Sequence, residues 1–246
     1  MRKRLLHQPI DILSFNEAIA RIKSSFLNKT QLKIITFNPE MIIEADKNFE
    51  FQAAINNSDL IVPDGVGIVW ALKKLQIEEN ISRIPGIELG KKALALANEL
   101  NKKVCLYGGS QEVLDACIKN LKSIFPNIDF RACFNGYEND QEKIVEALSK
   151  ENPNLVLVAL GSPRQELWIN KCSSYFPQST LIGVGGSFDI WSGLKKRAPG
   201  WMIDMHVEWL YRITSEPHRI SRVLKSHPKF IKMVFDEFKN LNLHTK

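Results

Sequence analysis

One carboxylate stands where the sequence constrains the backbone strongly. The apolar run at 60–62 meets Pro63, and Asp64 lies between that proline and Gly65. Proline fixes the backbone φ angle and glycine tolerates a left-handed one, so these residues predict a sharp turn that holds the carboxylate in place. A carboxylate held in this way can accept a proton as a general base, or it can cap a helix that follows. The sequence alone allows both interpretations.

Similar turns follow five other predicted strands. Their glycines and polar residues are Thr36 and Asn38; Gly108, Gly109 and Ser110; Tyr137; Gly161 and Gln165; and Gly185, Gly186 and Asp189. Because ligands of open parallel sheets bind beyond the carboxyl ends of the strands, we expect these residues to line one crevice with Asp64. The N–H groups at the starts of the helices that follow these turns are predicted to bind a phosphate.

Each turn also has an ordinary structural explanation. Ser110 is a good N-cap for the helix predicted after it. Ser162 could cap a helix that begins at Pro163, with Gln165 or Glu166 completing a capping box. The functional interpretation depends on all six turns meeting at one edge of a sheet.

Short apolar runs alternate with helical patterns along most of the chain. Strands are predicted at 32–37, 60–62, 103–107, 128–134, 155–160 and 180–184, and helices at 39–57, 66–75, 86–101, 110–124, 139–151 and 163–175. This alternation predicts an α/β protein with a Rossmann-like, mostly parallel sheet and helices on both faces. The run at 155–160 lacks polar alternation, as expected of a strand buried on both faces.

The net charge of +6 is carried by the C-terminal fifth of the chain, since residues 195–246 contain eleven Lys and Arg but five Asp and Glu. Apolar residues recur there at near-helical spacing among the basic ones, and Pro217 and Pro228 are expected to divide the segment into short helices. We therefore predict two parts, a core at 1–194 and a basic amphipathic helical appendage at 195–246 that contacts an anionic membrane surface. A solvated helix docked on the core is the alternative.

Several function classes lack their sequence signals. The chain has no Gly-x-Gly-x-x-Gly after a first strand, no Walker lysine motif, no Asp-x-Asp and no nucleophile elbow, and its four cysteines lack zinc-ligand spacing. We expect no cofactor and no metal. No apolar run reaches the roughly 18–20 residues of a membrane span, and polar residues interrupt the basic N-terminus, so a cytoplasmic protein is expected.

The ordered set of motifs resembles the WecG/TagA/CpsF glycosyltransferase family. It comprises TFNPE, VPDGVG, RIPG, LYGGS, LGSPRQELW, GVGGSFDIWSG, KRAPGW, EWLYR and EPHR, from about residue 8 to 230. The resemblance implies an inverting, metal-independent transfer of a sugar, most commonly N-acetylmannosamine, from a UDP donor to polyprenyl-diphosphate-linked N-acetylglucosamine. Its products belong to cell-surface polysaccharide or teichoic acid. N-acetylmannosaminuronic acid and glucose are alternative sugars. The resemblance also implies peripheral association with the inner face of the cell membrane.

The resemblance implies roles for individual residues. Asp64 is similar to the general base of the family, and Thr36, Asn38, Arg83 and Gln165 to its active-site residues. The appendage would present its arginines, Arg212, Arg219 and Arg222, to the diphosphates. With a UDP donor, the backbone amides of 108–110 and 185–187 are expected to bind its diphosphate. Tyr137 and Asp189 are predicted to lie near its nucleoside, where a tyrosine can stack on the base. Pro39 departs from the family pattern, which more often has Asn-Ala-Glu where this chain has Asn-Pro-Glu.

Rival functions remain open on the sequence. The chain could be a non-catalytic nucleotide-binding module whose basic tail binds nucleic acid, or an oxidoreductase acting on sugar nucleotides. The tail mixes its aromatic residues with aliphatic ones, which suits lipid better than base stacking, so no nucleic-acid partner is expected. The sequence allows a homo-oligomer without predicting one.

Overall fold

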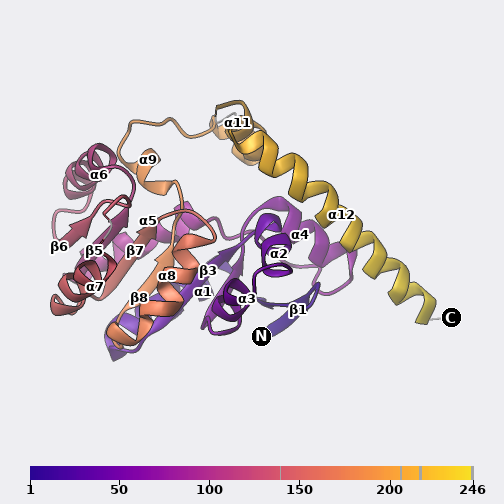
Figure 1. Cartoon of the computed structure of the whole chain (residues 1–246), viewed down its shortest axis with the longest axis horizontal. Helices are drawn as coiled ribbons and strands as arrows, with labels where there is room; N and C mark the ends of the chain where they lie inside the picture. Colours follow the sequence, from indigo (N-terminus) through magenta and orange to yellow (C-terminus); the bar gives the residue numbers. More distant parts are fainter. Residues whose placement is uncertain (139, 206, 216–217, 245–246) are drawn as a thin grey trace.

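A six-stranded parallel sheet forms the centre of the protein (Figure 1). The computed structural model describes residues 1–138, 140–205, 207–215 and 218–244. The strand order is β4-β3-β8-β7-β5-β6. The strands are β3 Leu32–Phe37, β4 Leu60–Pro63, β5 Lys103–Gly108, β6 Asp129–Phe134, β7 Leu155–Ala159 and β8 Thr180–Gly183. All six predicted strands are confirmed, and every neighbouring pair is parallel.

Helices connect these strands and largely follow the prediction. They are α1 Phe15–Asn28, α2 Pro39–Ala45, α3 Phe49–Asn56, α4 Val66–Lys74, α5 Gly86–Glu99, α6 Gln111–Ile124, α7 Gln141–Lys150, α8 Arg164–Cys172, the 3-10 helix η1 Ser173–Tyr175, α9 Ser187–Trp191, α10 Gly200–Asp204, α11 Glu208–Ser215 and α12 His218–His244. The helix predicted at 39–57 is two helices. The second, α3, starts anew because Asn48 caps it by accepting a hydrogen bond from the backbone N–H of Phe51.

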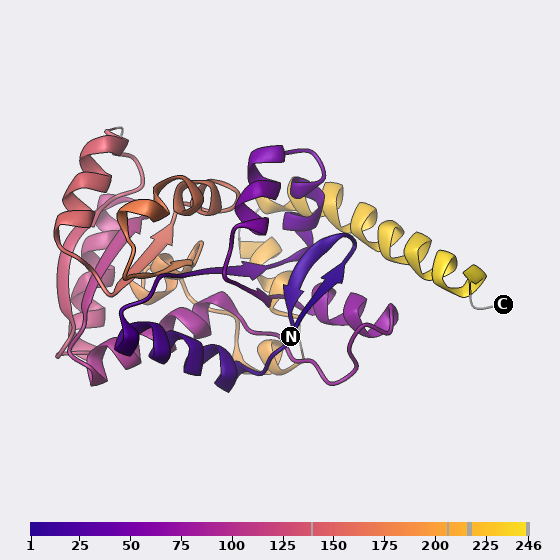
Figure 2. The ribbon, with the colours of Figure 1, turned by 90° about the horizontal axis from the view of Figure 1, so that it is seen from below.

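Three N-terminal elements were not predicted: two strands and helix α1. Strands β1 (Arg2–Leu5) and β2 (Gln8–Asp11) form an antiparallel hairpin, which Figure 2 shows beside the N-terminus. Helix α1 follows, and Ser14 and Glu17 form a capping box at its start. That signal was readable in the sequence, because a serine followed three residues later by glutamate often marks a helix start.

Both faces of the sheet are buried, and side chains alternate between them. Along β7, Leu155 and Leu157 face a cluster that contains residues of α1, α5 and α6, whereas Val156 and Val158 face one that contains residues of α7 and α8. A third cluster lies over β3 and β4 and includes residues of α2, α3 and α4. This arrangement confirms the predicted α/β fold and explains why the run at 155–160 is uniformly apolar.

The last helix packs on the core and does not end at Pro228. Helix α12 runs from His218 to His244 with Pro228 inside it, so the expected division at that proline is wrong. Two and six residues after that proline, Phe230 and Val234 are buried in the cluster that covers β3 and β4. Burial of these side chains outweighs the hydrogen bond that proline removes from the helix. The break expected at Pro217 lies outside the described residues.

Aromatic contacts fix α12 against α4. The Trp70 ring lies edge-on to the rings of Phe230 and Phe235, at centroid distances of 6.4 and 6.0 Å. The Lys74 ammonium lies 3.9 Å from the centroid of the Phe238 ring. Beyond these contacts the helix projects past the sheet in both views (Figures 1 and 2).

Replacing Phe230 with alanine should therefore destabilise the whole protein. Removal of a buried phenylalanine ring lowers the free energy of unfolding by about 3–5 kcal/mol. Urea denaturation followed by circular dichroism measures the effect. The exposed Leu224 of the same helix is the control, and Leu224→Ala should change the free energy by less than about 0.5 kcal/mol. An unchanged midpoint for Phe230→Ala would show that α12 does not share the core.

Candidate active site

The topology of the sheet reverses between β5 and β7. The chain leaves β5 toward β6 on one side and leaves β7 toward β8 on the other, which is where open α/β sheets bind ligands. The loops after these strands are in close contact there. Gly108 has φ +132°, and a Cβ on it would lie 2.4 Å from the Ala159 carbonyl oxygen. The Gly109 N–H donates to that same oxygen over 3.2 Å. Glycine is required because two backbones touch.

Asp64 lies at the corresponding end of β4. Its backbone N–H donates to the Phe37 carbonyl oxygen over 2.7 Å, and the Ile84 N–H donates to the Pro63 oxygen over 2.6 Å. Its Oδ2 accepts from the Gly86 N–H at the start of α5, at 3.2 Å. It is not the N-cap of α4, which is Gly65 without a side-chain hydrogen bond, so that alternative is wrong. The carboxylate therefore lies at the start of α5, where the helix carries a partial positive charge.

The Pro39 ring packs against the glycines that follow Asp64, a role that the sequence did not indicate. A Cβ on Gly67 would lie 2.7 Å from the Pro39 Cγ, and one on Gly65 would lie 3.8 Å from its Cδ. Gly65 itself has φ +86°, a left-handed conformation that favours glycine. Pro39 therefore packs against the turn that carries the carboxylate.

Thr36 and Asn38, at the end of the neighbouring strand β3, are placed beside this turn. Thr36 is buried, and its Oγ1 lies 2.9 Å from where a Cβ on Gly86 would be. Asn38 caps α2, since its Oδ1 accepts from the N–H groups of Glu40 and Met41 at 3.0 and 3.2 Å. The Asn38 oxygen therefore has a structural role as a helix cap, and its amide nitrogen is the group left to contact a substrate.

Gln165 forms a buried chain of hydrogen bonds. Its Oε1 accepts from the Gly185 N–H at 2.9 Å, and its Nε2 donates to Glu166 Oε1 at 2.7 Å. Burial raises the pKa of the Glu166 carboxyl to about 7. Helix α8 begins after Pro163 without a side-chain cap, so the expected cap by Ser162 is wrong. The sequence indicated Glu166 only as part of that cap, because an acidic residue in the first turn is typical of an ordinary helix start.

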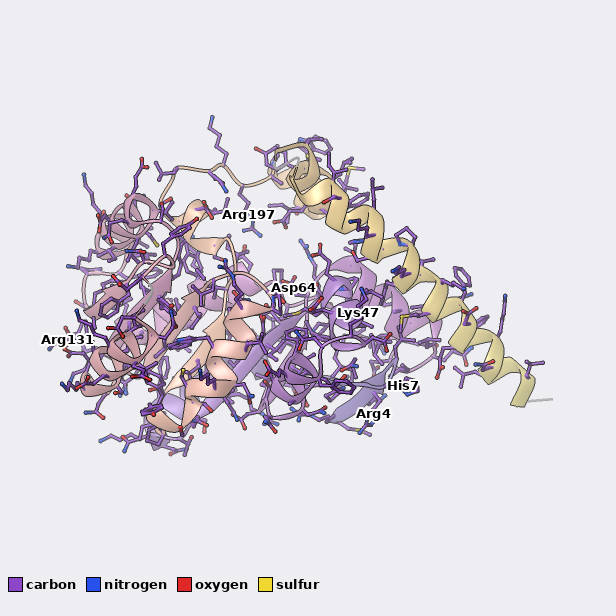
Figure 3. The ribbon with its side chains drawn as sticks, in the orientation of Figure 1. Arg4, His7, Lys47, Asp64, Arg131 and Arg197 are labelled. Atoms are coloured by element: carbon purple, nitrogen blue, oxygen red, sulfur yellow. The ribbon has the colours of Figure 1, made fainter. Side chains whose placement is uncertain are left out.

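Arg83 belongs to a group of ionic side chains around the start of α5. Its Nη1 lies 3.6 Å from Oε2 of Glu208, a buried residue on α11. Arg197 Nε lies 3.8 Å from Oε1 of the same glutamate, and Arg197 Nη1 also contacts Glu88 in the first turn of α5. Figure 3 shows Arg197 and Asp64 on the side of the sheet that faces α11, away from Arg4, His7 and Arg131. The sequence signalled Arg197 only as part of the KRAPGW motif.

The residues expected near a nucleoside are less closely grouped. Tyr137 is 77% exposed in the loop after the edge strand β6. Asp189 lies in α9, where its Oδ1 pairs with Lys195 Nζ at 3.1 Å. Their parent strands β6 and β8 are three positions apart, about 14 Å at the usual strand spacing. The joint contact of both residues with a nucleoside stays a prediction.

Several backbone groups expected to bind a diphosphate already have partners. Besides Gly109, the N–H of Gly185 donates to Gln165, and that of Ser187 to Val184. Ser110 caps α6 by accepting from the Val113 N–H at 3.2 Å, which confirms its structural interpretation. Gly161, with φ +75°, and Gly186, the N-cap of α9, line the same edge. Their contacts with substrate stay predictions.

The three arginines expected to meet the diphosphates lie on the last two helices. Arg212 is in α11, and Arg219 and Arg222 are in α12, but their side chains are outside the part that the structure describes. In the described ranges, no three His, Cys, Asp or Glu residues are grouped in a way that could hold a metal ion. None of the helices as described is both long and apolar enough to cross a membrane.

Comparison with known proteins identifies the family. The model of the glycosyl transferase WecG/TagA/CpsF family matches residues 3–243. A protein of Bacillus spizizenii strain W23 is 36% identical over 233 residues, covering 92% of this chain and 90% of its own. A protein of Bacillus subtilis strain 168 is 38% identical over 207 residues, covering 84% of this chain and 80% of its own. A protein of Staphylococcus aureus strain MW2 is 35% identical over 230 residues, covering 92% of this chain and 89% of its own. Each is named N-acetylglucosaminyldiphosphoundecaprenol N-acetyl-beta-D-mannosaminyltransferase.

The raised pKa of Glu166 predicts a pH dependence of stability. Between its ordinary value of 4.5 and about 7, the folded protein binds more protons at this site than the unfolded chain does, so the free energy of unfolding falls as pH rises. The loss amounts to about 3 kcal/mol, at roughly 1.4 kcal/mol per pKa unit. Urea denaturation at a series of pH values should show this decline in the wild type and a smaller one in Glu166→Gln. Parallel curves for the two proteins would contradict the prediction.

Proposed function

The chain belongs to the glycosyl transferase WecG/TagA/CpsF family, and on that premise we propose that it transfers N-acetylmannosamine from a UDP donor to N-acetylglucosaminyldiphosphoundecaprenol. Three relatives at 35–38% identity carry the name of this activity, and the alignments extend over most of each chain. This favours N-acetylmannosamine over its uronic acid or glucose. The product would enter cell-surface polysaccharide or teichoic acid synthesis.

The placement of Asp64 carries this proposal. In an inverting transfer, a base takes the proton of the acceptor hydroxyl, the hydroxyl oxygen bonds to the anomeric carbon of the donor, and the bond from that carbon to UDP breaks. Backbone hydrogen bonds hold the turn on both sides of Asp64, and the carboxylate meets the start of α5. A carboxylate fixed in this way loses little further freedom when it meets the acceptor.

Arginines are the proposed partners of the departing diphosphate. Arg83 precedes Ile84, which is hydrogen-bonded to the residue before Asp64, and Arg197 contacts the first turn of α5. Both therefore lie around the same helix start as the base. Guanidinium groups pair with phosphate oxygens through two parallel hydrogen bonds. With Arg212, Arg219 and Arg222 from the appendage, they would neutralise UDP without a metal. Thr36, Asn38, Tyr137 and Asp189 would complete donor binding.

The C-terminal helices are proposed to meet the membrane that carries the lipid acceptor. Large apolar side chains are exposed on these helices, at Trp201, Trp209, Leu210 and Leu224, and at Met205 just after α10. Basic residues Lys225, Lys229 and Lys232 are exposed on α12 beside them. Apolar anchors together with basic residues are typical of helices that lie in the interface of an anionic membrane. Residues 195–246 would then be a membrane-contacting appendage whose Phe230 and Val234 fasten it to the core.

A donor screen tests the proposed function directly. The assay combines the purified protein, a short-chain lipid-diphosphate-N-acetylglucosamine acceptor and single UDP-sugars, all in excess EDTA. We expect product with UDP-N-acetylmannosamine and little with UDP-N-acetylmannosaminuronic acid or UDP-glucose. Product that forms only after Mg²⁺ or Mn²⁺ is restored would disprove the metal-independent mechanism, and another preferred donor would replace the proposed sugar.

Asp64→Asn should lower kcat by about a hundredfold or more in this assay, because an amide cannot accept the proton. Its affinity for UDP, measured by calorimetry, should stay close to that of the wild type. Asp46→Asn, at an exposed carboxylate after α2, is the matched control and should keep full activity. A kcat within about tenfold of wild type would remove Asp64 from the role of base, since tenfold corresponds to only about 1.4 kcal/mol.

Neutralising Lys225, Lys229 and Lys232 to glutamine should weaken binding to anionic liposomes while sparing turnover on the short-chain acceptor. Each basic residue near such a surface contributes about 1 kcal/mol, so the loss should approach a hundredfold. Neutralising the exposed Lys91, Lys92 and Lys119 of the core changes the net charge equally and serves as control. Equal losses in both triple variants would argue against a specific membrane face.

A further inference from the structure

Glu166 is a buried acid that the proposed mechanism does not use. It lies in the first turn of α8 and is 3% exposed. Gln165 and Ser162 are its side-chain hydrogen-bond partners, and both are uncharged. Its second oxygen, Oε2, is buried without a hydrogen-bond partner among the described atoms. Burying such a group is unfavourable, so a residue kept there needs a compensating use.

The role of Glu166 can be inferred from the two hydrogen bonds of the Gln165 side-chain amide. One end must be oxygen, because the Gly185 N–H donates to it, and the other must be nitrogen, because it donates to Glu166 Oε1. If the amide turned over, two donors would face each other at Gly185 and two acceptors at Glu166. Glu166 therefore selects one of two orientations of Gln165.

Close packing against Gly183 also restricts the conformation of the Gln165 side chain. Its side chain lies directly over Gly183 at the end of β8, where an added Cβ would be 2.7 Å from Nε2 and 2.9 Å from Cδ. The amide then holds Gly185, which has φ +51°, and the chain continues through Gly186 into α9. The chain of contacts runs from Glu166 through Gln165 to the loop at 185–186, at the carboxyl edge of the sheet.

We propose that Glu166 is a positioning residue for sugar transfer, which acts through the Gln165 amide to fix the loop at 185–186 in the conformation that receives the donor. This rests on the function proposed above. It assigns Gln165 an indirect part as well, because its amide is buried and engaged at both ends. The loop, and not Gln165 or Glu166, would contact the donor.

The test compares an apolar and a conservative replacement of Glu166. Glu166→Met keeps the side-chain length but removes the acceptor, whereas Glu166→Gln retains one acceptor for Gln165. In Glu166→Met we expect kcat/KM for the UDP-sugar to fall about tenfold, and hydrogen exchange of the Gly185 amide, followed by NMR, to accelerate about tenfold. Glu166→Gln should stay within about twofold of wild type in both measurements. Unchanged exchange and kinetics in Glu166→Met would overturn the proposal.

A double-variant comparison separates positioning from a general structural role. If Glu166 acts through Gln165, then adding Glu166→Met to Gln165→Met should produce no further loss of kcat/KM. Losses that multiply in the double variant would overturn the proposal. The exchange measurement needs no substrate, so it tests the contact even if the donor screen disproves the proposed function.

Gly183→Ala provides a second perturbation in case Glu166→Met does not fold. The added methyl group displaces the Gln165 amide and leaves the Glu166 side chain unaltered. It should reproduce the faster Gly185 exchange and the loss of kcat/KM. Gly200→Ala is the control, because nothing lies within 4 Å of a Cβ at that position. Wild-type exchange at Gly185 in Gly183→Ala would overturn the proposal.

Discussion

Close packing against glycine backbones at the carboxyl edge of the sheet is the constraint on which the site depends. The loops after β5 and β7 touch, the first residue of α5 lies against Thr36, and Gln165 lies over Gly183. At each place a glycine occupies a position where a Cβ would meet another atom at under 3 Å. The glycines therefore act first as packing residues. Their packing leaves Asp64, the loop at 185–186 and the start of α5 in fixed positions at the edge proposed to bind the substrates.

Two buried glutamates illustrate different ways in which the protein places a carboxyl group out of water. Glu208 lies beside two arginines, Arg83 and Arg197, so its charge is compensated. Glu166 is hydrogen-bonded through neutral groups, and burial raises its pKa to about 7. The first arrangement joins α11 to the start of α5, and the second organises a loop. Ion pairs thus link α11 to the start of α5, whereas hydrogen bonds order the loop at 185–186.

Helix α12 has two surfaces with different consequences. Phe230 and Val234 are buried on β3 and β4, next to the strand end that carries Asp64, whereas Leu224 and the lysines around it are exposed. A helix that contacts the core on one side and a membrane on the other would hold the base at a fixed height above the bilayer. For the proposed acceptor, whose diphosphate would lie at the membrane surface, that height would decide whether the sugar hydroxyl reaches Asp64.

Local patterns in the sequence determined the strands, the parallel class of the sheet and the turn that carries Asp64. Apolar runs and the residues that punctuate them act over a few positions, so they can be interpreted without knowing what lies nearby. The cap at Ser110 was predictable for the same reason. Helix α1 had a capping box of this local kind and could have been found.

Only the tertiary structure decided which distant residues meet. Glu208 lies beside Arg83, and Gln165 accepts a hydrogen bond from Gly185. Pro39 packs against the turn that carries Asp64, 25 residues later in the sequence. Pro228 stays inside a helix because Phe230 finds a buried position on another part of the chain. Such outcomes depend on the free energy of long-range packing, which outweighs local propensity and leaves no mark in the spacing of neighbouring residues.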